Sequence, residues 1–184
     1  MKKQLSIIIA IVTLNISCKQ SVSTNHEKQH KISKIDTQKE SESLNKLKNE
    51  QFIQNDSLAY AFEAELEELA LTNKKFSLKL NPYQNHHDEN VIDTIKTYTY
   101  DKTELEFYKA SNWEHIIGGV IKNSEISLGD SIKVGITKTT LGKSLNVGIN
   151  SDIVQLGNLE QTSLFIFEFN DEVLKTIKFE GYFD

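Results

Sequence analysis

Arginine is absent from this chain of 184 residues, and all 21 of its basic residues are lysines. The guanidinium group of arginine is the side chain best suited to grip a phosphate with two parallel hydrogen bonds. The formal net charge of the chain is −5, so the chain would also repel a polyanion. These two features argue against nucleic-acid binding.

Cysteine and proline each occur once, as Cys18 and Pro82. A single cysteine cannot form a disulfide within the chain, and it cannot build a thiolate zinc site. The eight glycines and the 38% of apolar residues exclude a collagen-like chain and fit a folded domain. The length is sufficient for one modest hydrophobic core.

Long apolar runs are also missing. The longest lies between Leu5 and Leu14, which is about half of the roughly 20 residues that a membrane-spanning helix needs. Lys2 and Lys3 precede this run, and a short positive region followed by an apolar region is typical of a secretory signal peptide. We therefore expect residues 1–17 to be a signal peptide.

The segment Leu14-Asn15-Ile16-Ser17-Cys18 follows the apolar region directly. It resembles the lipobox of bacterial lipoproteins, in which the cysteine thiol is acylated and the cysteine becomes the first residue of the mature chain. The family pattern has leucine three residues before the cysteine, whereas here Asn15 holds that place. The resemblance implies lipidation of Cys18, which would also remove its thiol as a nucleophile. A plain signal peptide with an incidental cysteine is the alternative.

The whole chain resembles the small lipoproteins of Gram-negative bacteria. Proteins of this kind carry two or three acyl chains such as palmitate, and more than one chain is needed for stable membrane attachment. Lys19, rather than aspartate, follows the cysteine, and in that class of proteins this favours the outer membrane. Loss of Lys2 and Lys3 with the signal peptide would change the formal charge from −5 to −7.

Residues 18–55 are dominated by Lys, Glu, Gln, Ser and Asn. Such a composition buries too little apolar surface to offset the entropy of ordering, so we expect a disordered or transiently helical tether. His26 and His30 are four residues apart, a spacing that metal ligands on a helix use. In this solvated context we interpret the spacing as coincidence.

The folded domain is expected over residues 56–184, and it begins with a helix over 57–72. Asp56-Ser57 offers N-cap chemistry. Apolar residues then recur at the spacing of one helical face, at Leu58, Phe62, Leu66 and Leu69. Acidic residues occupy other positions, and we interpret them as a solvated face rather than a partner-binding face: Glu63, Glu65, Glu67 and Glu68.

Residues 76–183 are expected to be rich in β-strands. The pattern predicts strands over 76–80, 91–100, 104–109, 113–122, 163–169 and 173–181, with a polar loop over 84–90. Thr137 is the expected N-cap of a short helix over 138–147, and residues 148–162 are expected to form a long loop. Asn81-Pro82 is expected to end the first strand, and Gly118-Gly119 to mark a bulge or a close backbone approach. The predicted fold class is α+β, an antiparallel sheet with helices packed on one face.

The last third of the chain carries a second resemblance. Residues 132–137, a short helix, and a β-hairpin ending in Val173-Leu174-Lys175-Thr176-Ile177 follow one another. This succession is similar to the small lipoproteins of outer-membrane β-barrel assembly and to β-lactamase-inhibitor-protein-like modules. The resemblance implies a non-catalytic scaffold. The preceding β-rich segment and the long loop over 148–162 depart from that pattern.

Few residues suggest catalysis or metal binding. His86, His87 and Asp88 lie together with Glu89 in the polar loop, where a metal ion could in principle be held. We interpret them as a solvent-exposed connector, with no metal and no cofactor, and His115 is distant in sequence. Glu104 and Glu106 would lie about 7 Å apart on one strand face, which solvent-facing alternation explains. The chain contains no Gly-x-Ser-x-Gly turn and no Gly-rich phosphate loop.

Four aromatic residues have two possible roles. Tyr98, Tyr100, Tyr108 and Trp113 would form either part of the core or a platform for a sugar or peptide. The sequence thus favours a non-enzymatic envelope lipoprotein that presents a surface to a protein partner. A glycan-binding or metal-binding module is the alternative, and a hydrolase with an unrecognised site is the third possibility.

Overall fold

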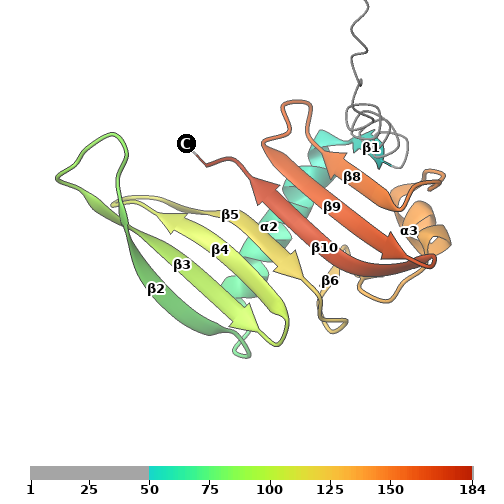
Figure 1. The fold of residues 1–184 in the computed structure, drawn as a ribbon, viewed down its shortest axis with the longest axis horizontal. Coiled ribbons are helices and arrows are strands. Elements are labelled where there is room, and N and C mark those ends of the chain that lie inside the picture. The colour runs from blue at the N-terminus through green and yellow to red at the C-terminus, as the bar shows by residue number, and fades with distance from the viewer. Residues whose placement is uncertain (1–49, 184) are drawn as a thin grey trace, which may run out of the picture. The chain divides into compact units, whose positions relative to one another are not determined.

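The computed structural model describes residues 50–183, which form an α+β domain (Figure 1). Cys18, His26 and His30 lie outside the described residues, as do the predicted signal peptide and most of the predicted tether. Within 50–183, no helix is both long and apolar enough to cross a membrane.

The main element is a sheet of eight strands in the spatial order β1-β8-β9-β10-β5-β4-β3-β2. Neighbouring strands are antiparallel except for β1 and β8, which are parallel. The strands of this sheet are β1 (Glu50–Gln54), β2 (Ser77–Gln84), β3 (Ile92–Tyr100), β4 (Thr103–Lys109), β5 (Glu114–Ile121), β8 (Ile153–Gly157), β9 (Ser163–Asn170) and β10 (Val173–Gly181). A separate two-residue ladder joins β6 (Ser127–Leu128) to β7 (Ile132–Lys133). The predicted α+β class, with a mostly antiparallel sheet, is confirmed.

Two helices flank the sheet, α2 (Asp56–Thr72) and α3 (Lys138–Leu145). Asn55, not Asp56 or Ser57, is the N-cap of α2, because its side chain accepts a hydrogen bond from the Leu58 amide at 3.1 Å. Thr137 caps α3 as predicted, accepting from the Thr140 amide at 3.2 Å. Both caps satisfy amides that have no partner within the helix.

Helix α2 lies across one face of the sheet (Figure 1). It buries Ala59, Phe62, Leu66 and Ala70, which are three or four residues apart. The ring of Phe62 meets that of Phe165 on β9 edge to face, at 5.6 Å between centroids. Burying this stripe against the sheet is the main source of helix stability, since propensity alone contributes little.

Two predictions about loops were wrong. Residues 50–54 were assigned to the tether, but they form β1, and the predicted loop over 148–162 contains β8. The two short strands pair with each other, with Phe52 opposite Gln155, and are about 100 residues apart in sequence. The apolar residues of β1 are Phe52 and Ile53 alone, whereas β8 carries Ile153, Val154 and Leu156, a strand pattern that the prediction missed. The parallel pairing of the two strands is a tertiary contact that neither segment indicates by itself.

The first predicted strand does not end at Asn81-Pro82. Pro82 lies within β2, opposite Thr94 of β3. Proline cannot donate to a ladder and is therefore confined to edge strands, and β2 is the last strand of the sheet.

The sheet divides between β5 and β10. These strands pair only from Gly118 to Ile121, so the first half of β5 has β4 but not β10 beside it. Ile117 has no partner across the β4–β5 ladder, where the register shifts next to Phe107. A Cβ on Gly119 would lie 2.6 Å from Leu105 Cδ2, so the predicted bulge and close approach are both present at the glycine pair.

Side chains of α2 reach into this division, which we call the fork. Glu67 Oε1 accepts a hydrogen bond from the Ile116 amide at 3.0 Å. A carboxylate thus satisfies a backbone donor in the half of β5 that lacks β10 as a neighbour. Glu63 lies one helical turn earlier and faces the same region.

Candidate binding surface

Six aromatic and imidazole rings form one contiguous group, which we call the ring cluster. They come from β2, the loop after it, β4, the start of β5 and the C-terminal residues. Their centroids lie between 4.6 and 6.4 Å apart in successive contacts. The members are Tyr83, His86, Tyr108, Trp113, His115 and Phe183.

The ring cluster lies on the sheet face opposite α2. Phe107 points into the core, and side chains alternate along a strand, so Tyr108 points to the other face. His115 lies directly across from Tyr108 in the ladder. No helix covers this face (Figure 1), and two rings of the cluster, Trp113 and Phe183, are 49% and 39% exposed.

The buried carboxylate of Asp93 holds Tyr108, one member of the ring cluster, in position. It is 4% exposed, and it accepts hydrogen bonds from the Tyr108 hydroxyl and from Asn85 Nδ2. The hydrogen bond to Asp93 raises the pKa of Tyr108 above its ordinary value, with burial adding to the rise. Asn85 also accepts bonds from the amides of His87 and Asp88 and thereby fixes the loop.

The side chain of Trp113, just before β5, is half exposed, at 49%. Its indole stacks on the His115 imidazole with 4.6 Å between centroids and 15° between planes. A shallow groove of about 310 Å³ adjoins Trp113, and its other lining residues are small or polar: Lys109, Ala110, Ser111, Asn112 and Glu114. One aromatic face and several hydrogen-bonding groups therefore border the same space.

A second groove, of about 290 Å³, lies at the fork on the other side of His115. Tyr60 and Glu63 of α2 border it, together with His115, Thr162 and Tyr182. Burial holds the pKa of the Glu63 carboxyl above its usual value of 4.5. A hydrogen bond with the Ser163 side chain opposes this rise, the Glu67 carboxylate adds to it, and His115 opposes it. Because His115 lines this groove and stacks on Trp113, the two grooves are adjacent.

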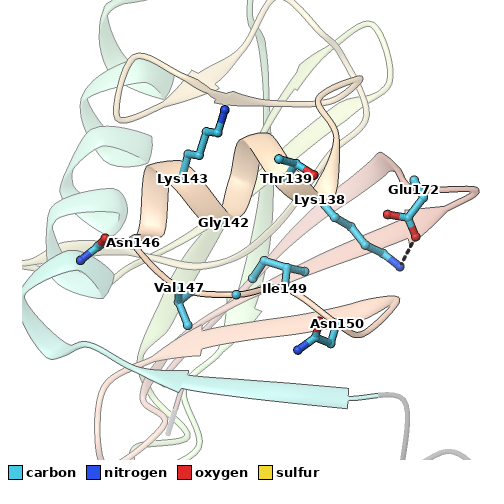
Figure 2. Close-up of a pocket in the computed structure, with 10 residues that line it drawn as sticks. Lys138, Thr139, Gly142, Lys143, Asn146, Val147, Ile149, Asn150 and Glu172 are labelled. Carbon is cyan, nitrogen blue, oxygen red and sulfur yellow. Dashed lines mark hydrogen bonds and ion pairs between the residues drawn. The ribbon is translucent and has the colours of Figure 1, made fainter.

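A third cleft, of about 570 Å³, lies beside α3 (Figure 2). Lys138 extends toward Glu172 there, while Lys143 points away from both (Figure 2). The Lys138 ammonium is already bonded to Asp152 at 2.8 Å and to Glu172 at 2.9 Å. Binding sites usually have polar groups that converge on a ligand. The polar groups here diverge or are paired, so we do not assign a site to this cleft.

The polar loop that contains the candidate metal ligands is held by internal hydrogen bonds. His86 Nε2 is 2.5 Å from the Tyr83 hydroxyl, and Asp88 Oδ1 accepts from the Asn90 amide. The His87 side chain is exposed. Among residues 50–183, no group of three or more His, Cys, Asp or Glu side chains is placed to hold a metal ion.

The four predicted aromatic residues do not act together. Tyr98 is buried against Phe107 at 5.2 Å, and Tyr100 packs on Phe76 at 5.9 Å. Only Tyr108 and Trp113 join the ring cluster. Tyr98 and Tyr100 therefore have packing roles, and the platform stays a prediction that concerns Tyr108 and Trp113.

Glu104 and Glu106 occupy the face of β4 opposite the core, across from Val120 and Gly118. This placement agrees with solvent-facing alternation. The sequence did not indicate Tyr83, Phe183 or Glu63 as site residues, because they come from an edge strand, the C-terminal end and a helix. Only a regular register of strand pairing across β2, β3 and β4 could have indicated that Tyr83 lies near Tyr108.

No protein-family model, curated protein or solved structure matches this chain.

Proposed function

We propose that the chain is a lipid-anchored, non-enzymatic envelope lipoprotein whose folded domain binds a glycan through the ring cluster. The observation that carries the proposal is the half-exposed Trp113 indole bordering a shallow polar groove. A sugar ring has one apolar face of C–H groups and a rim of hydroxyls. Such a ligand matches an aromatic face flanked by hydroxyl, amide and charged groups.

The shape of the groove favours a sugar over an apolar side chain. Anchors of protein interfaces occupy well-packed, desolvated pockets. The groove at Trp113 is open, and Ser111 and Asn112 beside it are exposed. The stacked His115 and the buried Asp93–Tyr108 pair hold the indole in place, which reduces the entropy lost on binding.

The test is glycan binding by the full chain and by Trp113→Ala. We expect binding of neutral hexasaccharides, measured by calorimetry, to weaken at least about tenfold in the variant, the loss of about 1.4 kcal/mol. Phe52→Ala is the matched control, since Phe52 is 44% exposed on β1 and lies outside the ring cluster. Equal binding by all three proteins would contradict the proposal.

The lipid anchor is a separate element of the proposal, supported by the segment that precedes Cys18. Mass spectrometry of the protein from its own membranes should show a diacyl or triacyl mass on a chain that begins at Cys18. Cys18→Ala should lack this mass. An unacylated mature chain would contradict the anchor and leave the glycan site untouched.

A second candidate function is the binding of a protein partner at β2. Leu78, Leu80 and Ile92 are exposed on one face of the β2–β3 pair, and edge strands can accept an added strand. Lys79 and Pro82 on the same strand oppose such pairing. Photo-crosslinking from position 80 in cells would favour this candidate if one envelope protein is captured and Leu78→Lys, on the same face of β2, abolishes its capture.

A further inference from the structure

The fork groove is lined by one helix carboxylate and by two tyrosine rings. Glu63 on α2 borders the groove and is partly buried, and Glu67 lies four residues later on the same face. Tyr60 and Tyr182, both more than half exposed, border it from the helix and from the residue after β10. Thr162 and His115 complete the lining.

The groove has an excess of negative charge. The ion pairs between lysines and carboxylates within residues 50–183 involve neither Glu63 nor Glu67. The Glu67 carboxylate accepts a hydrogen bond from the Ile116 amide. The basic side chain that lines the groove is His115. A partly desolvated carboxylate gains most from a ligand that brings a positive charge and N–H donors.

The aromatic walls favour the same ligand. A cation placed near the face of a tyrosine ring is attracted by the ring quadrupole, and the attraction grows as water is excluded. Tyr60 is held in position, because its hydroxyl accepts a hydrogen bond from Asn158 Nδ2 at 2.9 Å. A carboxylate and tyrosine rings around one small groove therefore suit a compact ammonium group and not an anion.

We propose that the fork groove binds the ammonium group of an amino sugar, with Glu63 as its counter-ion. The inference rests on the proposed function in one respect, because the ammonium is assigned to the glycan bound at Trp113. His115 joins the two grooves: its ring stacks on Trp113, and its Nε2 lies 3.1 Å from the Tyr182 carbonyl oxygen at the fork. An oligosaccharide of a few units would cover both grooves.

The experiment compares glucosamine hexasaccharide with N-acetylglucosamine hexasaccharide on the full chain, at physiological salt and at a pH where the amines are protonated. We expect the hexasaccharide with free amines to bind about tenfold more tightly or better, because a hydrogen bond to a charged partner is worth more than one between neutral groups. Glu63→Gln should remove this difference. Glu68→Gln is the matched control, since it deletes the same charge from an exposed position of α2.

This control separates a site from general attraction. The chain is acidic, so a polycation is drawn to it at any surface. Equal loss of preference in Glu63→Gln and Glu68→Gln would overturn the inference. Retention of the preference in Glu68→Gln and its loss in Glu63→Gln would support it.

The remaining outcomes separate this inference from the proposed function. If both hexasaccharides bind equally and Trp113→Ala weakens both, the glycan site stands and the ammonium site is overturned. If neither hexasaccharide binds, the glycan proposal fails. A titration with n-butylamine, followed by NMR, then tests the ammonium site alone. Shifts of the His115 and Tyr182 signals that disappear in Glu63→Gln would support an ammonium site, and unchanged signals would overturn it.

Discussion

The carboxylate of Asp93 on β3 accepts a hydrogen bond from the hydroxyl of Tyr108 on β4, beneath the ring cluster. Both residues are less than a tenth exposed. The bond ties the polar loop after β2 to β3 and β4 through Asn85, which also bonds to Asp93 at 2.6 Å. Order in the candidate glycan surface therefore depends on a residue that is almost fully buried.

Asp93→Ala should destabilise the fold by about 1–3 kcal/mol, because the buried Tyr108 hydroxyl loses its acceptor. Tyr108→Phe should lower the unfolding free energy less than Asp93→Ala does. It removes the donor and leaves the Asp93 carboxylate, which Asn85 still contacts. Chemical denaturation of the two single variants and the double variant measures the coupling. If the losses of unfolding free energy in the two single variants add up to the loss in the double variant, the Asp93–Tyr108 hydrogen bond contributes no coupling energy.

Gly119→Ala should destabilise the fold by about 1–3 kcal/mol, a cost typical of overpacking a core. The added Cβ would lie 2.6 Å from Leu105 Cδ2 and 3.1 Å from the Glu104 carbonyl oxygen, and Leu105 is fully buried. Gly118→Ala is the matched control, because its nearest contact is Phe179 O at 3.6 Å. Denaturation midpoints that fall equally in both variants would contradict the close packing assigned to Gly119.

Glu63→Gln should stabilise the fold at pH 7 more than at pH 4. Burial raises the pKa of the Glu63 carboxyl above 4.5, so the folded protein binds a proton more readily than the unfolded chain does. Stability from this group therefore falls as the pH rises from about 4.5 through the raised pKa, and the cost persists at neutral pH. Glutamine has no such charge.

The measurement for Glu63 is the unfolding free energy of wild type and variant at both pH values. Glu68→Gln is the control, because it reports the general effect of deleting one charge from α2. A stability gain in Glu63→Gln that is unchanged between pH 4 and pH 7 would contradict the burial of this carboxyl.

Lys138 links the start of α3 to two other elements, and its side chain is only 9% exposed. Its partners, Asp152 and Glu172, are 60% and 71% exposed. Lys138→Met should cost about 1 kcal/mol, because exposed carboxylates are readily solvated again. The double variant that carries Asp152→Ala and Glu172→Ala should lose about 3 kcal/mol of unfolding free energy, because it leaves a buried ammonium without a counter-ion.

The pH dependence of the Lys138 linkage has a defined sign. Hydrogen bonds to Asp152 and then Glu172 raise the pKa of Lys138 above 10.5. The contribution to stability is therefore present below pH 10.5 and is lost as the pH rises through the higher folded value. Alkaline denaturation of wild type and Lys138→Met should converge above that pH, and parallel curves would contradict the linkage.

Local elements whose side chains carry a clear period or a capping residue are predictable from the amino-acid sequence. The stripe from Phe62 to Leu66 predicts a helix, Thr137 predicts the start of α3, and the alternation in 163–169 predicts a buried strand. In each case the information lies within a few residues, because the helical and strand periods and the capping bonds are local properties.

Three features are visible only in the folded domain: the pairing of β1 with β8, the division of the sheet at the fork and the assembly of the ring cluster. Each depends on contacts between residues far apart in sequence, such as Phe52 with Gln155 and Tyr83 with Tyr108. A short strand with few apolar residues is stable only when a neighbour supplies its hydrogen bonds, and a site exists only where side chains from several elements meet. The physical reason is that pairing energy resides in the assembled sheet and not in the segment.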